Sequence, residues 1–160
     1  MAITASIQYD ELLEKCKQGD SKSLAELYQK YSRTMYNTCL RIVNNSEDAE
    51  EVLQDVFIDA FSSLKNFQYK SSFGTWLKRI AINKSISFLR RKKIPLSDID
   101  ETTDRELPTD EATDEDVIRL KVEEIKKAMT LLPNGYRTTL TLYFFEGYDH
   151  EEIAEILNLS

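Results

Sequence analysis

The stretch KNFQYKSSFGTWLKRIAINKSISFLRRKK, from Lys65 to Lys93, is the most strongly patterned part of this 160-residue chain. It contains no Asp or Glu. Nine of the chain's 21 Lys and Arg residues fall within it: Lys65, Lys70, Lys78, Arg79, Lys84, Arg90, Arg91, Lys92 and Lys93. Four aromatic residues are interleaved with these charges: Phe67, Tyr69, Phe73 and Trp76. Cations beside flat rings suit a phosphate backbone with unstacked bases, so the stretch predicts a nucleic-acid site with some single-stranded character. A basic membrane-surface helix would not need the polar, aromatic loop in front.

The second half of the stretch has the apolar spacing of a helix that begins near Thr75. Pro95 ends this helix, because proline disfavours helical backbone in the residue before it. The side chains expected to face inward are Trp76, Leu77, Ile80, Ala81, Phe88 and Leu89. The side chains that remain for a basic, polar surface are Lys78, Arg79, Asn83, Lys84, Ser87, Arg90 and Arg91.

The clearest helix precedes this stretch, in DAEEVLQDVFIDAF from Asp48 to Phe61, where apolar residues recur three and four positions apart. Ser46 is the expected N-cap. The other side of this helix carries acids and an amide, which suit either plain solvation or a basic partner.

Two further helices are expected before it, one from Tyr9 to Gly19 and one that Asp20 or Ser21 caps and Asn44-Asn45 ends. These four helices predict a first domain of residues 1–94.

A second domain is expected at residues 114–160, after a linker of residues 95–113 without periodicity. Pro133 and Gly147 separate three short helical segments, and Asp149 with Glu152 predicts a capping box for the last one. The expected fold is therefore all-α, with two small helical domains joined by a flexible acidic linker.

Composition excludes several classes of function. With two cysteines, Cys16 and Cys39, and His150 as the sole histidine, neither a metal site, a cofactor nor a catalytic triad is expected. No apolar run reaches the roughly 18 residues of a membrane span, and no leader is apparent, which predicts a cytoplasmic protein. The net charge of -7 is compatible with DNA binding because acids concentrate elsewhere, in Asp98, Asp100, Glu101, Asp104, Glu106, Asp110, Glu111, Asp114, Glu115 and Asp116.

Three stretches in this order resemble the extracytoplasmic-function (ECF) sigma factors, bacterial transcription initiation factors with two helical domains. They are DAEEVLQDVFIDAF, NFQYKSSFGTWLKRIAINKSISFLRR (Asn66 to Arg91) and LLPNGYRTTLTLYFFEGYDHEEIAEILNLS (Leu131 to Ser160). The resemblance implies that the first stretch docks on the β′ clamp helices of core RNA polymerase through Asp48, Glu51, Gln54 and Asp55. The resemblance also implies an anti-sigma partner that masks the polymerase-docking face and the DNA-binding face.

In such factors the loop of the second stretch holds a base flipped out of the -10 element of promoter DNA, and the following helix reads another base. The resemblance therefore implies these DNA-binding residues: Phe67, Gln68, Tyr69, Lys70, Ser71, Ser72, Lys78, Arg79, Asn83, Lys84, Ser87, Arg90 and Arg91. Asn83 matches the base-reading position, since a side-chain amide can bond a base edge in two places. The cations suit phosphate contacts. Two roles are open for Trp76, core packing or stacking near the melted junction.

The third stretch resembles a helix-turn-helix domain that reads the -35 element. Residues 149–157 match its supporting helix and residues 158–160 its turn, so we expect a chain cut within the motif that lacks its recognition helix. The leading hypothesis is a promoter-specificity factor that captures the single-stranded -10 element and catalyses no covalent reaction. The alternatives are a duplex-binding helix-turn-helix regulator and a helical protein-interaction module, which would leave the acid-free stretch unexplained.

Overall fold

The computed structural model of this chain describes residues 2–92 and 114–159, and these residues form helices and no strand, as predicted. The chain divides into two compact units, residues 1–91 and 92–160. The expected linker, residues 95–113, lies outside the described residues. Each unit consists of helices, and the first unit contains nearly all of the acid-free stretch from Lys65 to Lys93.

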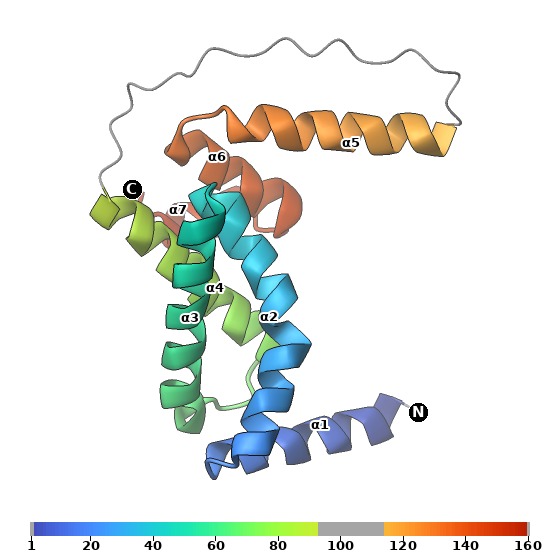
Figure 1. Cartoon of the computed structure of the whole chain (residues 1–160), viewed down its shortest axis with the longest axis vertical. Helices are drawn as coiled ribbons and strands as arrows, with labels where there is room; N and C mark the ends of the chain where they lie inside the picture. The colour runs from blue at the N-terminus through green and yellow to red at the C-terminus, as the bar shows by residue number, and fades with distance from the viewer. Residues whose placement is uncertain (1, 93–113, 160) are drawn as a thin grey trace. The chain divides into compact units, whose positions relative to one another are not determined.

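A helical hairpin forms the frame of the first unit. Helix α2 (Ser21–Val43) begins after Asp20, whose carboxylate accepts a hydrogen bond from the Ser23 backbone N–H at 3.1 Å. It ends at Asn44, which adopts the left-handed conformation with φ of 57°. Helix α3 (Ser46–Ser63) follows at once, so α2 and α3 run alongside each other in opposite directions (Figure 1).

The N-cap of α3 differs from the prediction. Asn45, not Ser46, has the extended backbone of a cap, and its side-chain oxygen accepts a hydrogen bond from the Asp48 backbone N–H at 3.0 Å. Both residue types cap well, and the sequence could not show which one leaves the helix first. Because Asn44 and Asn45 together make the turn, Ser46 is already the first helical residue.

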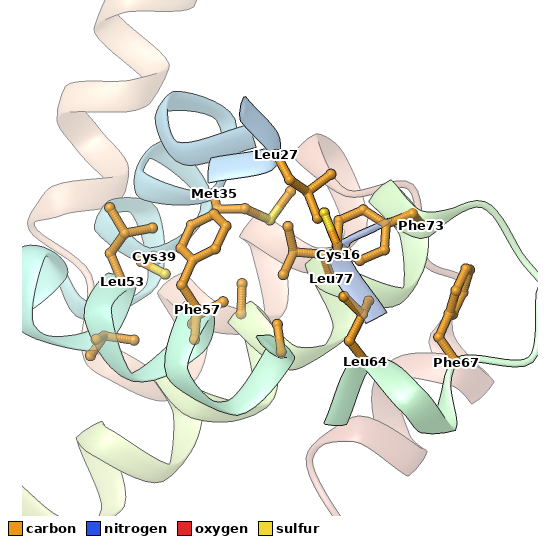
Figure 2. Close-up of a cluster of buried hydrophobic side chains, with 14 of the residues drawn as sticks. Cys16, Leu27, Met35, Cys39, Leu53, Phe57, Leu64, Phe67, Phe73 and Leu77 are labelled. Carbon is orange, nitrogen blue, oxygen red and sulfur yellow. The ribbon is translucent and has the colours of Figure 1, made fainter. Parts of the chain in front are cut away.

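Three more elements complete the first unit: α1 (Ala2–Lys17), the 3₁₀ turn η1 (Leu64–Asn66) and α4 (Phe73–Lys92). Helix α1 begins before the predicted Tyr9 and packs against α2 and η1. Figure 2 shows the core between them, where Leu27 and Met35 from α2 meet Phe57 from α3 and Leu77 from α4. Of the α4 side chains expected inside, Leu77 and Ala81 are fully buried, and the others are half-buried against the core.

The second unit contains α5 (Asp114–Thr130), α6 (Asn134–Leu140), the π-helical segment η2 (Thr141–Phe145) and α7 (His150–Ile156). The predicted capping box of α7 is confirmed, because Glu152 N–H donates to Asp149 and Asp149 N–H donates to Glu152, both at 2.9 Å. Met129 of α5 is buried, but Ile118 and Ile125 on the same helix are 61% and 57% exposed.

Both cysteines are buried thiols in the first unit, as expected of core residues. Burial raises the pKa of the Cys16 thiol, and it raises the pKa of Cys39 to about 11. Among the described helices, none combines enough length with enough apolar character to cross a bilayer.

Candidate nucleic-acid interface

One face of α4 presents three of the polar residues that the sequence analysis assigned to DNA. Asn83, Ser87 and Arg90 are exposed and lie four and three residues apart, so they share a face over successive turns. Arg91 is exposed beside them, whereas Lys78 and Arg79 are half-buried. The Asn83 amide therefore points to solvent on a helix that carries no acid.

Lys84, one of the candidate cations on α4, forms an ion pair with the neighbouring helix α3. Its ammonium lies 3.8 Å from a carboxylate oxygen of Asp59 on α3, and both side chains are partly exposed. An exposed pair of this kind contributes little to stability and dissociates easily. A phosphate that binds Lys84 would compete with Asp59 for the charge.

The segment of residues 67–72, which we call the recognition loop, connects η1 to α4. Gln68, Tyr69, Lys70, Ser71 and Ser72 are exposed.

Phe67 departs from its predicted role. It is 4% exposed and belongs to the core cluster, where Figure 2 shows it at the margin beside Phe73. Its ring centroid lies 4.8 Å from that of Tyr69, 5.8 Å from Phe73 and 5.2 Å from Trp76. Because burial stabilises an aromatic ring more than exposure in a polar loop would, Phe67 anchors the loop instead of offering its ring to a base. Trp76, half-buried, packs in the same group.

The two loop serines are partly engaged with the backbone. The Ser72 hydroxyl accepts a hydrogen bond from the Thr75 backbone N–H at 3.2 Å, so Ser72 caps the start of α4. The Ser71 hydroxyl donates to the Ser72 carbonyl oxygen at 3.2 Å. The side chains of Gln68 and Lys70 are exposed and make none of the described hydrogen bonds.

Two residues of α1 contact the loop, and sequence reasoning missed both. The Tyr69 hydroxyl donates to Glu14 Oε1 at 2.6 Å, and Lys17 Nζ donates to the Phe67 carbonyl oxygen at 3.1 Å. The hydrogen bond from Tyr69 lowers the pKa of the Glu14 carboxyl, and removal from water, followed by that bond, raises the pKa of the Tyr69 hydroxyl. These residues are separated by 50 or more positions, and no local pattern links them.

The second candidate surface is the acidic side of α3. Glu51 and Gln54 are exposed, and Asp48 and Asp55 are half-buried. Ile58, one turn after Gln54, is 67% exposed on the same side and was not among the expected contact residues. A methyl-rich side chain in an otherwise polar row gives this face an apolar point of contact for a partner.

No group of three or more His, Cys, Asp or Glu side chains in the described ranges could hold a metal ion. The arrangement is one of binding surfaces: an exposed amide among cations on α4, a polar loop anchored by aromatic packing, and an acidic face on α3.

Comparison with known families matches both units. The family model of Sigma-70 region 2 matches residues 27–94, and that of Sigma-70 region 4 matches residues 122–160.

Individual relatives are similar in sequence to nearly the whole of this chain. The RNA polymerase sigma-H factor of Pseudomonas aeruginosa is 33% identical over 159 residues, covering 94% of this chain and 82% of that protein. The ECF RNA polymerase sigma factor SigW of Bacillus subtilis is 31% identical over 157 residues, covering 92% of this chain and 83% of that protein. A solved structure of CnrH in complex with the cytosolic domain of CnrY has the same fold, with a TM-score of 0.54 at 21% identity over 93% of this chain and 82% of that one.

Proposed function

This chain belongs to the ECF family of RNA polymerase sigma factors, and on that basis we propose how its residues bind the polymerase and the promoter. As a sigma factor it binds RNA polymerase and promoter DNA, and it is not an enzyme. Its region 2, residues 27–94, recognises the -10 element.

We propose that the exposed face of α4 and the recognition loop together bind the unpaired -10 strand. The exposed Asn83 side chain, on a helix without acids, is the observation that carries this proposal. Asn83 lies ten residues after Phe73, about 15 Å along α4, so the loop and Asn83 contact different bases of one strand. Asn83 reads a base edge, Gln68 and Lys70 contact the base held by the loop, and Arg79, Arg90 and Arg91 bind phosphates.

Capture of bases and phosphates drives strand opening in this proposal. Extruding one base from the stack costs a few kcal/mol, which contacts in a pocket must offset. Phosphate contacts add affinity that does not depend on sequence.

The acidic side of α3 is proposed to dock on the β′ clamp helices of core polymerase. Hydrogen-bond acceptors for a basic helix come from Asp48, Glu51, Gln54 and Asp55. Ile58, one turn after Gln54, adds an exposed apolar side chain that the partner can cover. An anti-sigma factor would mask the same surfaces, and transcription places the activity in the cytoplasm.

The proposed division of the chain assigns residues 1–94 to polymerase docking and -10 recognition and residues 95–113 to a connection. Residues 114–160 belong to the domain of region 4, with α7 as the supporting helix of its helix-turn-helix.

A fork-binding assay tests this function. The chain is assembled with core polymerase and titrated with a DNA fork whose -10 segment is single-stranded, in a preferred and in a scrambled sequence. Asn83→Ala is expected to weaken binding about tenfold on the preferred sequence and little on the scrambled one, since one good base contact contributes roughly 1–3 kcal/mol. Arg91→Gln should weaken both forks alike.

The alternatives give different results in the same assay. Preference of the isolated chain for intact duplex, with no binding to polymerase, would indicate a duplex-binding regulator. Binding to neither DNA nor polymerase would indicate a helical interaction module.

A further inference from the structure

The recognition loop is fixed from outside by α1 through a small set of polar contacts. Lys17 Nζ lies 3.5 Å from Glu14 Oε1, donates to the Phe67 carbonyl oxygen at 3.1 Å and sits 4.3 Å from the centroid of the Tyr69 ring. The Tyr69 hydroxyl closes the set by donating to Glu14 at 2.6 Å. One ammonium and one carboxylate on adjacent turns of α1 thus hold both the backbone and a side chain of the loop.

The loop needs such support because its backbone is strained at Tyr69. The φ angle of Tyr69 is 58°, in the left-handed region. For a residue with a Cβ, this backbone conformation is roughly 1–2 kcal/mol less stable than the right-handed one. The ring is held on one side by Phe67, at 4.8 Å between centroids, and by Lys17 over its face. Without the α1 contacts, nothing polar in the described structure would hold the Tyr69 hydroxyl in place.

We propose that Glu14 and Lys17 are positioning residues for promoter recognition, which hold the recognition loop in the conformation that accepts a base of the -10 strand. This inference rests on the proposed function and adds to it residues outside the region 2 match, which begins at residue 27. It also reassigns Tyr69, whose hydroxyl is engaged by α1. Tyr69 supports the loop, and Gln68 and Lys70 are left to contact DNA.

The physical reason is preorganisation. Ordering one residue costs roughly 1–2 kcal/mol, so a loop that is already ordered binds a base without this loss. If the contacts are removed, only a fraction of molecules hold the loop in the competent conformation, and the apparent affinity falls by that fraction. Only DNA that uses the loop should be affected, because the described contacts of Glu14 and Lys17 reach Phe67 and Tyr69 and not the exposed Asn83 face of α4.

Three variants each remove one group. Tyr69→Phe deletes the hydroxyl that donates the hydrogen bond, Glu14→Gln replaces the carboxylate that accepts it with a neutral amide, and Lys17→Met deletes the ammonium. Tyr28→Phe is the matched control, since Tyr28 is also 41% exposed and packs edge-on against an aromatic ring, that of Phe57, while its hydroxyl makes none of the described hydrogen bonds. Lys15→Met is the matched control for Lys17, on the same helix and exposed.

The measurement is binding of each variant, assembled with core polymerase, to forks in which every -10 position is made abasic in turn. For the wild-type chain we expect two sensitive positions, one that Asn83→Ala abolishes and one that belongs to the loop. In the three variants, the loss at the loop position should shrink from about tenfold to about two- or threefold. The loss at the Asn83 position, and both losses in the control variants, should stay unchanged.

Two results would overturn the proposal: an unchanged loss at the loop position in all three variants, or an equal decrease in the loss at both positions, which would mean that the variants disturb the α4 face as well as the loop. Hydrogen exchange of residues 68–72 in the chain without DNA gives a second readout, which should be faster in the variants and unchanged in Tyr28→Phe. A wild-type complex with no sensitive position at all would instead remove the proposed function, and with it this role of α1.

Discussion

Ile58 is the residue on α3 that the docking proposal uses and that sequence patterning passed over. It is 67% exposed in a row of acids and an amide, so burying it against a partner gains apolar contact without loss of core packing. Ile58→Ala is expected to weaken binding to core polymerase about tenfold, as for a moderate interface anchor, and Ile58→Val about twofold. Titration of labelled core polymerase measures both, with Glu26→Ala on α2 as a neutral control. Equal affinity of Ile58→Ala and wild type would contradict this placement of the interface.

Glu14 should make loop packing sensitive to acid. The hydrogen bond from Tyr69 lowers the pKa of Glu14 in the folded chain, so the stability it contributes is present above the unfolded pKa, about 4.3. That contribution is lost as the pH falls through the lowered, folded pKa. We therefore expect Glu14→Gln to lower the Tm at pH 7 and to have a smaller effect at pH 3. Thermal melts at the two pH values test this, and an equal decrease at both would show that the charge of Glu14 does not matter.

At the scale of helices, the turn between α2 and α3 offers a paired test. Asn45 caps α3 through its hydrogen bond with the Asp48 N–H, whereas the adjacent Ser46 is within the helix. Asn45→Ala should lower the free energy of unfolding by about 1 kcal/mol, and Ser46→Ala should change it by less than about 0.5 kcal/mol. Urea unfolding followed by circular dichroism distinguishes them. A larger effect at Ser46 would indicate that Ser46, and not Asn45, is the N-cap of α3.

Helices and their exposed faces were predictable because both depend on residues a few positions apart. The apolar spacing placed α3 and α4, and the same spacing left Asn83, Ser87 and Arg90 on the outer face of α4. The capping box at Asp149 was equally local. The change from α-helical to π-helical backbone at Thr141 was not predicted, since no residue type there marks it.

Contacts between distant elements were beyond the reach of these patterns. Phe67 and Tyr69 lie in one aromatic-rich stretch, yet one ring is buried and the other partly exposed, and only the packing of α1 and α4 decides this. For the same reason, Glu14 and Lys17 looked like ordinary surface charges. The described structure thus leaves Asn83, Ser87 and Arg90 exposed on α4 but buries Phe67 among the core rings.

For the whole molecule, the separation of charge predicts a particular dependence on salt. The chain has a net charge of -7, but the stretch from Lys65 to Lys93 contains no acid, so DNA binding relies on local phosphate contacts. Each contact with a single strand adds about 0.7 to the slope of log affinity against log salt. We expect Arg91→Gln to reduce this slope for fork DNA by about 0.7, while Asn83→Ala lowers affinity without changing it. Titrations at several KCl concentrations test both, and an unchanged slope in Arg91→Gln would exclude Arg91 from the phosphate contacts.

The burial of both thiols also limits how this factor can respond to oxidants. Cys16 is 4% exposed and Cys39 fully buried, and burial raises the pKa of Cys39 to about 11, so the thiol form predominates at pH 7. Peroxide and alkylating reagents attack the thiolate, so both residues should react slowly while the chain is folded. Neither thiol of this chain is therefore placed to react with an oxidant while the first unit is folded.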